Sequence, residues 1–367
     1  MNNRRTWLKQ TGLAIVGVGI MPLEHFAIPK SENIIEDKND LTLIRLQSNE
    51  NPYGPSTLAK NAMSKNLNIS NRYNWEMLEE LMGNIAVKHN LTAQNILLGA
   101  GSSEILNLVA LYCSKKPGNL IIAETTFDYW TVTAENAGLK KIAIPLTVDK
   151  KNDLAAMLKA IEPDTKLVYI CNPNNPTGTI CSNKALLDFI NEATKKTTVL
   201  VDEAYLDFTN QPSLANLVKE NKNLIIVKTF SKIYALAGSR IGYAMAHPDT
   251  ITELSQLQFS PNASISVVSA AGAIASLKDD KFVTDTIALN AAAREYTIEQ
   301  LQKLNIPCIA SHTNFVYFSL ENYNKDFFNQ LTENNILGTK IYEEQGKWSR
   351  ITIGTLKEMK QFIKALG

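Results

Sequence analysis

A lysine that follows an expected strand is the residue best placed for covalent chemistry. Lys232 comes shortly after the apolar run Leu224 to Lys228, with Ser231 before it and Arg240 further along the same segment. Burial lowers the pKa of a lysine, and its free amine can then form a Schiff base with an aldehyde. Serine and arginine side chains are suitable donors to a phosphate dianion. A lone lysine is usually a solvated surface charge, so the prediction depends on the other motifs.

A second motif ends another apolar run with a carboxylate and a phenol. Asp202 follows Val199 to Val201, and Tyr205 comes next in the same segment. A pyridine ring that accepts electrons needs an anion beside its protonated nitrogen, and Asp202 suits that task. Tyr205 can hydrogen-bond a ring oxygen. The alternative is that Asp202 only caps a following helix.

Two turns complete the set of motifs. The turn Cys171 to Gly178 contains two prolines and a glycine, and its Asn175 is a candidate for the ring oxygen, although such loops are mostly structural. In Gly99 to Glu104, Ser102 and Ser103 would bind phosphate where a helix begins. This turn matches neither a P-loop nor a dinucleotide fingerprint. Together the motifs predict a pyridoxal-phosphate (PLP) site, with Lys232, Asp202 and Tyr205 as catalytic residues.

The motifs are expected at the carboxyl ends of strands in an α/β fold. Compact apolar runs alternate with helical patterns, which is typical of a mostly parallel sheet between helices. From about residue 260 the pattern becomes helix-rich, with further strands at Phe315 to Ser319 and Arg350 to Ile353. We expect a signal segment at 1–29, an N-terminal arm at 30–70, a large domain at 71–259 and a small α+β domain at 260–367.

Composition excludes several classes of partner. The 367 residues include 37 Lys and Arg against 36 Asp and Glu, so no field of one sign would attract nucleic acid. The four cysteines are scattered, without the spacing of a disulfide framework or a zinc site, and no metal is expected.

The N-terminus resembles an export signal. Arg4 and Arg5, followed by Trp7, Leu8 and Lys9, are similar to a twin-arginine motif, although Asn3 stands where Ser or Thr is usual. The apolar stretch Leu13 to Met21 is too short for a stable membrane span. We expect a periplasmic protein, cleaved after Ala27 or left uncleaved. The alternative is a basic tail on a cytoplasmic protein.

From about Leu43 to Gly367 the sequence resembles the histidinol-phosphate aminotransferase family, within the class I and II aminotransferases. The resemblance rests on six segments: Ser48 to Pro55, Asn71 to Tyr73, Asp202 to Tyr205, Ser231 with Lys232, Leu236 to Gly238, and Arg350 to Thr355. It implies a fold type I PLP-dependent transferase that forms a homodimer, with Tyr73 reaching the cofactor phosphate of the partner subunit. It also implies that Ser102, Ser103, Ser231 and Arg240 hold the phosphate, that Asn175, Asp202 and Tyr205 hold the ring, and that Lys232 bears the Schiff base.

Two positions depart from the family pattern. Trp130 stands where a tyrosine commonly stacks on the cofactor ring; an indole can also stack, or Trp130 can be part of the core. Of two arginines usual for the substrate's anionic group, Arg350 is present, whereas the other position falls at Lys340 or Thr339. Tyr53 and Asn175 complete the expected substrate site.

The resemblance implies an amino donor, either an amino acid or an amino-alcohol phosphate, and a keto-acid acceptor such as 2-oxoglutarate. One alternative is a PLP-dependent decarboxylase on the same scaffold. Another is a catalytically silent exported binding protein, which would have no need of Lys232 beside Asp202. A kinase-like enzyme is remote, because the P-loop and the acidic metal pair are missing.

Overall fold

The structure is a computed structural model that describes residues 43–367, which form one compact unit. The expected signal segment 1–29 and the first part of the expected N-terminal arm lie outside the described residues.

The larger of the sheets has seven strands in the order β2-β8-β7-β6-β5-β3-β4. Strand β8 is antiparallel to both of its neighbours, whereas β3 to β7 pair in parallel. The predicted α/β fold with a mostly parallel sheet is therefore confirmed. The strands are β2 (Ile96–Gly99), β3 (Gly118–Ala123), β4 (Leu139–Ile144), β5 (Thr165–Cys171), β6 (Thr198–Asp202), β7 (Leu224–Thr229) and β8 (Gly242–Ala246).

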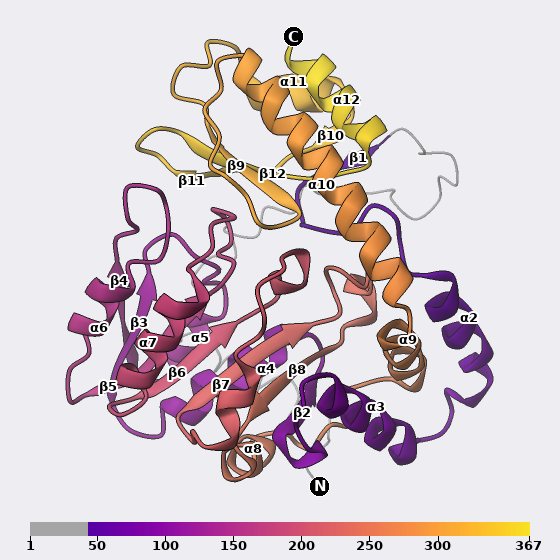
Figure 1. The fold of residues 1–367 in the computed structure, drawn as a ribbon, viewed down its shortest axis with the longest axis vertical. Helices are drawn as coiled ribbons and strands as arrows, with labels where there is room; N and C mark the ends of the chain where they lie inside the picture. The colour runs from indigo at the N-terminus through magenta and orange to yellow at the C-terminus, as the bar shows by residue number, and fades with distance from the viewer. Residues whose placement is uncertain (1–42) are drawn as a thin grey trace, which may run out of the picture. The chain divides into compact units, whose positions relative to one another are not determined.

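Helices cover both faces of this sheet (Figure 1). Successive strand residues point to opposite faces, so Val199 and Val201 of β6 pack in one core cluster and Leu200 in another. Both faces are buried, which explains why the central strands read as continuous apolar runs. Packed in the first cluster are α3 (Trp75–Lys88), α6 (Leu154–Lys159), α7 (Asn183–Ala193) and α9 (Val267–Leu277); packed in the second are α4 (Ser102–Cys113), α5 (Thr131–Asn136) and α8 (Pro248–Ser255).

A smaller antiparallel sheet lies near the C-terminus, in the order β11-β12-β9. Its strands are β9 (Phe315–Ser319), β11 (Ile341–Glu343) and β12 (Trp348–Thr352). The helices α10 (Asp280–Lys303), α11 (Phe327–Glu333) and α12 (Leu356–Leu366) pack with it in a third core cluster. Strand β1 (Ile44–Arg45) pairs in parallel with β10 (Ile336–Leu337), so the start of the described chain joins this part of the molecule.

Helix α10 contributes to two different core clusters. Val283 and Ile287 pack against the first core cluster, whereas Ala293 and Leu301 belong to the third. Helix α9, beyond the expected boundary at residue 260, packs on α3 and on α2 (Thr57–Lys65). The division into domains at 70 and 260 stays a prediction. The short 3-10 helices are η2 (Leu67–Ile69), η3 (Ala93–Asn95), η4 (Leu206–Phe208), η5 (Ala215–Lys219) and η6 (Ala237–Ser239).

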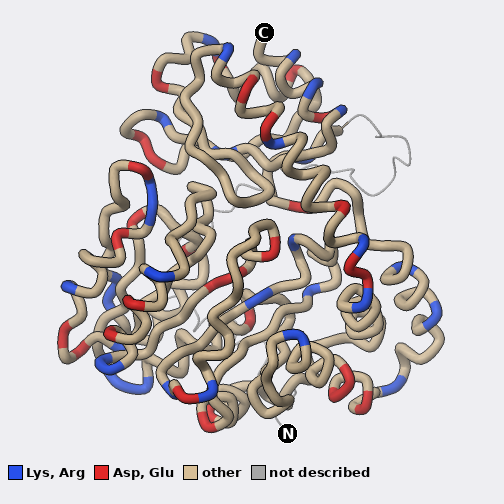
Figure 2. The backbone as a smooth tube through the Cα atoms, viewed as in Figure 1, with Lys and Arg blue, Asp and Glu red and all other residues tan. Residues whose placement is uncertain are grey.

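Charged residues of both signs are interspersed along the described chain (Figure 2). None of the helices in residues 43–367 is long and apolar enough to cross a membrane.

Candidate active site

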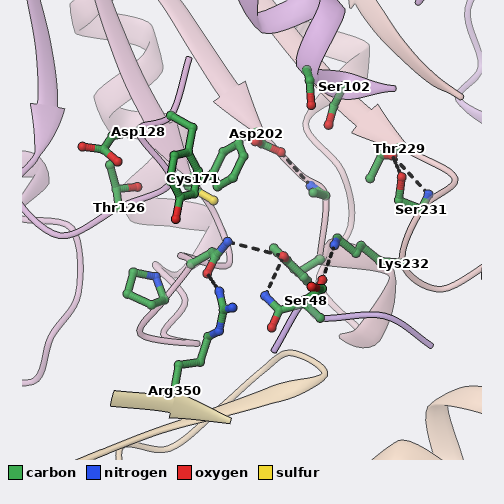
Figure 3. Close-up of a pocket in the computed structure, with 18 of the residues that line it drawn as sticks. Ser48, Ser102, Thr126, Asp128, Cys171, Asp202, Thr229, Ser231, Lys232 and Arg350 are labelled. Atoms are coloured by element: carbon green, nitrogen blue, oxygen red, sulfur yellow. Dashed lines mark hydrogen bonds between the residues drawn. The ribbon is translucent and has the colours of Figure 1, made fainter. Parts of the chain in front are cut away.

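The predicted site residues meet at a cavity of about 510 Å³. It is formed where β5, β6 and β7 end and α4 begins, together with the segment Gln47 to Asn49 and residues of the smaller sheet (Figure 3). The cavity therefore lies at the carboxyl ends of the parallel strands, as expected for this fold class. The predicted residues that line it are Ser102, Ser103, Asn175, Asp202, Tyr205, Ser231, Lys232, Arg240, Lys340 and Arg350.

Lys232 projects from the segment after β7 with its amine available. Its Nζ donates to the carbonyl oxygen of Ser48 at 3.3 Å and lies 5.7 Å from the ring centroid of Tyr205. Loss of hydration lowers the pKa of Lys232 to about 8, and the nearby Arg350 cation acts in the same direction. Near neutral pH a minor but much increased fraction of the protein molecules thus carries Lys232 as the free amine that Schiff-base formation requires.

Asp202 is a buried carboxylate at the end of β6, with only 3% of its surface exposed. The Tyr169 hydroxyl donates to its Oδ2 at 3.0 Å, and the backbone N–H of Ala204 donates to its Oδ1 at 3.0 Å. Burial raises the pKa of Asp202, and these two hydrogen bonds act against that rise. Tyr205, rather than Asp202, stands at the start of the short helix η4, so the helix-cap alternative does not account for Asp202.

Tyr205 is a buried phenol that accepts hydrogen bonds from two amides. Asn49 Nδ2 donates to its Oη at 2.9 Å, and Asn175 Nδ2 lies 3.5 Å from the same atom. Burial raises the pKa of Tyr205, so the phenol keeps its proton. Its O–H can therefore donate to an oxygen in the cavity.

The N-terminus of α4 forms a cradle suited to phosphate. Ser102 and Ser103 are its first residues, and Arg240 reaches the same turn, with Nη2 3.4 Å from the carbonyl oxygen of Ala100. Gly101 precedes them at φ +78°, where a Cβ would collide with the Arg240 guanidinium. Free backbone amides, hydroxyls and a guanidinium are the donors that bind a phosphate dianion. The residues present therefore fit the phosphate of PLP.

The opposite end of the cavity is cationic. Arg350 of β12, 7% exposed, donates from Nη1 to Asn175 Oδ1 at 2.6 Å and from Nη2 to the Gln47 carbonyl at 2.7 Å. Lys340 Nζ lies 5.8 Å and 5.5 Å from the ring centroids of Tyr129 and Tyr342. Within residues 43–367, neither cation has a carboxylate within ion-pair distance. Two unpaired cations at a cavity suit an anionic substrate group.

Three predicted site residues lie outside this cavity. Trp130, 4% exposed, packs edge-on to Tyr169 at 5.0 Å between ring centroids, so the packing favours its core alternative over stacking on the cofactor. The Trp130 indole N–H donates to the Phe127 carbonyl, and Tyr129 lines the cavity. Tyr53 borders a separate crevice beside Asn290.

Tyr73, the third of these residues, is 84% exposed and stacks on Trp75 at 5.6 Å between ring centroids. Its expected contact needs a second subunit and stays a prediction.

Several lining residues were not predicted. Asn49 belongs to the motif Ser48 to Pro55, but the sequence does not reveal its contact with Tyr205, because the two residues are far apart along the chain. Ser48 and Gln47 act through carbonyl oxygens, which carry no side-chain signal. Tyr342 lies only two residues beyond the predicted Lys340, and its ring contacts the Lys340 ammonium at the cavity. The others are Thr126, Phe127, Asp128, Tyr129, Cys171, Pro176, Ala204 and Thr229, whereas Thr339, the predicted alternative to Lys340, also lines the cavity.

The chain belongs to the class I and II aminotransferase family, whose model matches residues 42–366. The site and the family together define a PLP-dependent aminotransferase of fold type I, which confirms the predicted enzyme class, fold and cofactor.

Two relatives illustrate the match in sequence. The chain is 33% identical to the histidinol-phosphate aminotransferase of Moorella thermoacetica over 329 residues, 88% of this chain and 84% of that one. It is 35% identical to that of Caldicellulosiruptor saccharolyticus over 345 residues, 91% of this chain and 94% of that one.

Solved structures agree on the fold. The histidinol-phosphate aminotransferase of Clostridium acetobutylicum matches with a TM-score of 0.79 at 25% identity, covering 88% of this chain and 98% of that one. The enzyme of Sinorhizobium meliloti, in complex with pyridoxal-5'-phosphate, matches with a TM-score of 0.81 at 22% identity, covering 89% and 90%.

Proposed function

We propose that this enzyme moves the amino group of an amino-alcohol phosphate or an amino acid to a keto acid such as 2-oxoglutarate, in the manner of a histidinol-phosphate aminotransferase. The observation that supports this most is that Arg350 and Lys340, at the end of the cavity opposite the phosphate cradle, have no carboxylate partner among residues 43–367. Relatives that carry the name histidinol-phosphate aminotransferase support the same class of donor.

Each residue around the cavity has a defined task in this reaction. Bound PLP supplies a conjugated ring that accepts the electron pair left when the donor Cα loses its proton. The Lys232 amine takes that proton and returns it, acting as general base and then as general acid. Asp202 holds the proton on the ring nitrogen, and Tyr205 with Asn175 holds the ring oxygen. Arg350 and Lys340 bind the substrate anion, which fixes the Cα–H bond relative to the ring.

Product analysis tests the proposal. The enzyme is incubated with histidinol phosphate and 2-oxoglutarate, and glutamate and carbon dioxide are both measured, with Lys232→Ala as the inactive control. Glutamate formed in step with loss of histidinol phosphate supports the proposal. Histidinol phosphate has no carboxyl group to lose, so a second incubation replaces it with a phosphorylated amino acid; carbon dioxide released there without consumption of the keto acid would establish the decarboxylase alternative. Activity with a neutral donor in place of phosphorylated and carboxylated ones would refute the role of the two cations.

We also propose a homodimer in which Tyr73 completes the partner's phosphate cradle. Tyr73, Trp75 and Phe259 are large aromatic residues with exposed surfaces, as expected for a face covered by another subunit. A mixture of Lys232→Ala and Tyr73→Ala subunits should regain activity, because mixed dimers contain one intact site. Gel filtration should give the mass of a dimer. Full activity of Tyr73→Ala alone would contradict this arrangement.

Export through the twin-arginine route is a further proposal, which rests on Arg4 and Arg5 in the sequence. Replacing both arginines by lysine should retain the protein in the cytoplasm of an expressing bacterium, whereas the unaltered chain should reach the periplasmic fraction. Equal distribution of the two proteins would contradict export by this route.

A further inference from the structure

Asn49 occupies a buried position between the smaller sheet and the cavity. It is 2% exposed and has a φ of +53°, a conformation that asparagine tolerates better than most residues. Its backbone N–H donates to Thr352 Oγ1 of β12 at 2.8 Å, and its carbonyl oxygen accepts from Asn314 Nδ2 at 3.0 Å. The backbone of Asn49 is therefore held by residues far from it in the sequence.

The orientation of the Asn49 amide follows from these contacts. Thr352 Oγ1 accepts from the Asn49 backbone, so its own O–H is available to donate to Asn49 Oδ1 at 3.1 Å. With Oδ1 turned to Thr352, Nδ2 faces Tyr205 and donates to its Oη at 2.9 Å. The Tyr205 oxygen is thus occupied as an acceptor, and its O–H proton is left to point into the cavity.

We propose that Asn49 is a positioning residue that aims the Tyr205 hydroxyl at the ring oxygen of the cofactor and connects this hydroxyl to strand β12. Donation from Asn49 draws electron density from the phenol oxygen, which makes Tyr205 a better donor to the ring. Thr352 locks the amide, and Arg350 lies on the same strand. The inference concerns the cofactor end of the cavity and does not depend on the identity of the amino donor.

A spectrophotometric pH titration of the cofactor-loaded enzyme, without substrate, measures this effect. A phenol that donates to the ring oxygen withdraws negative charge from it, so weaker donation should move the midpoint of the titration to higher pH. Asn49→Ala should raise the midpoint by on the order of half a pH unit, the equivalent of part of one hydrogen bond. In a Tyr205→Phe background, the same replacement should give no further shift.

Two further variants separate positioning from a general loosening of the fold. Asn49→Asp keeps the side-chain shape and the contact with Thr352, removes the donor and adds a negative charge, and both changes should raise the midpoint. It serves if the alanine variant does not fold, and only the part of its shift that disappears in the Tyr205→Phe background supports the proposal. Asn95→Ala is the matched control, because Asn95 is a buried amide that donates to the Ala246 carbonyl at 2.9 Å, outside the cavity. Its midpoint should equal that of the unaltered enzyme.

The outcomes are distinct. A shift in Asn49→Ala that disappears in the Tyr205→Phe background supports the proposal. An unchanged midpoint in both Asn49 variants would overturn it, as would an equal shift with and without the Tyr205 hydroxyl, since Asn49 would then not act through Tyr205.

Discussion

At the scale of single residues, the chemistry depends on one amine that is partly deprotonated near neutral pH. Lys232 reaches this state because loss of hydration and the Arg350 cation both disfavour its charge. Asp202 lies nearby as a buried carboxylate held by Tyr169. The pKa of Lys232 is shifted in the direction that the reaction needs, whereas burial raises the pKa of Asp202 and the hydrogen bonds from Tyr169 and Ala204 oppose that rise.

The lowered pKa of Lys232 predicts a pH dependence of stability in the cofactor-free enzyme. The folded-state value of about 8 lies below the unfolded value of 10.5, so between these values the unfolded chain binds more protons. The contribution of this residue to stability should therefore rise as pH increases from 8 to 10.5. The melting temperature of the unaltered protein should rise relative to that of Lys232→Met as pH increases across this range. Parallel curves would contradict the lowered pKa.

Lys340 is predicted to act in substrate binding more than in the chemical step. Its ammonium lies over two aromatic rings at the cavity, with no carboxylate partner among the described residues. Lys340→Ala should raise KM for a phosphorylated donor roughly tenfold, about 1.4 kcal/mol, with a smaller effect on kcat. Lys357→Ala, an exposed lysine on α12, is the control. An unchanged KM would remove Lys340 from the substrate site.

At the scale of elements, the phosphate cradle requires the backbone geometry of the turn before α4. Gly101→Ala introduces a Cβ at φ +78° that collides with the Arg240 guanidinium, so we expect PLP affinity to fall by at least about tenfold. Gly138 has a φ of +100° but open space around its Cβ position, which makes Gly138→Ala a matched control for backbone strain alone. Both affinities can be measured by fluorescence titration of the cofactor-free proteins. Equal affinities would contradict the clash.

A buried ion cluster also lies near the ends of β6 and β7, formed by Lys228 of β7 with Glu203 and Asp207, which follow β6. Lys228 Nζ lies 3.1 Å from Asp207 Oδ1 and 3.8 Å from Glu203 Oε2. Burial opposes the charge of Lys228, but the two carboxylates outweigh it and raise its pKa. Glu203 directly follows Asp202, and Lys228 directly precedes Thr229, so the cluster neighbours two cavity-lining residues in the sequence.

Removing the cation should leave buried carboxylates without compensation. Lys228→Met is expected to destabilise the protein by about 3–5 kcal/mol in urea unfolding. Lys184→Met, which breaks an exposed pair with Asp188, should change stability little. Equal effects of the two substitutions would show that the buried cluster is not structurally important.

At the scale of the whole molecule, the site combines the ends of the large sheet with the segment Gln47 to Asn49 and with strand β12. The cofactor end could be predicted from sequence because its residues follow apolar strands, and parallel strands bring their carboxyl ends together. Asp202, Lys232 and Asn175 are of this kind. The contacts of Asn49 and Gln47 could not be predicted, because they depend on how the N-terminal segment packs between distant elements.

The sequence also could not predict the direction in which side chains next to a turn point. Trp130 and Tyr129 are neighbours, and spacing does not decide which ring enters the core and which lines the cavity. The sequence also does not show where along α10 the helix passes from the first core cluster to the third, because one continuous helix packs against both clusters.

The central claim is that Lys232 is the residue that binds the cofactor aldehyde covalently. Reduction of the loaded enzyme with borohydride, followed by peptide mass spectrometry, tests this most directly. The account predicts that the mass of the reduced cofactor is attached to Lys232 and to no other lysine, and that the attachment is lost in Lys232→Ala. Attachment at Lys228 or Lys340 instead, or cofactor retained covalently in the alanine variant, would contradict it.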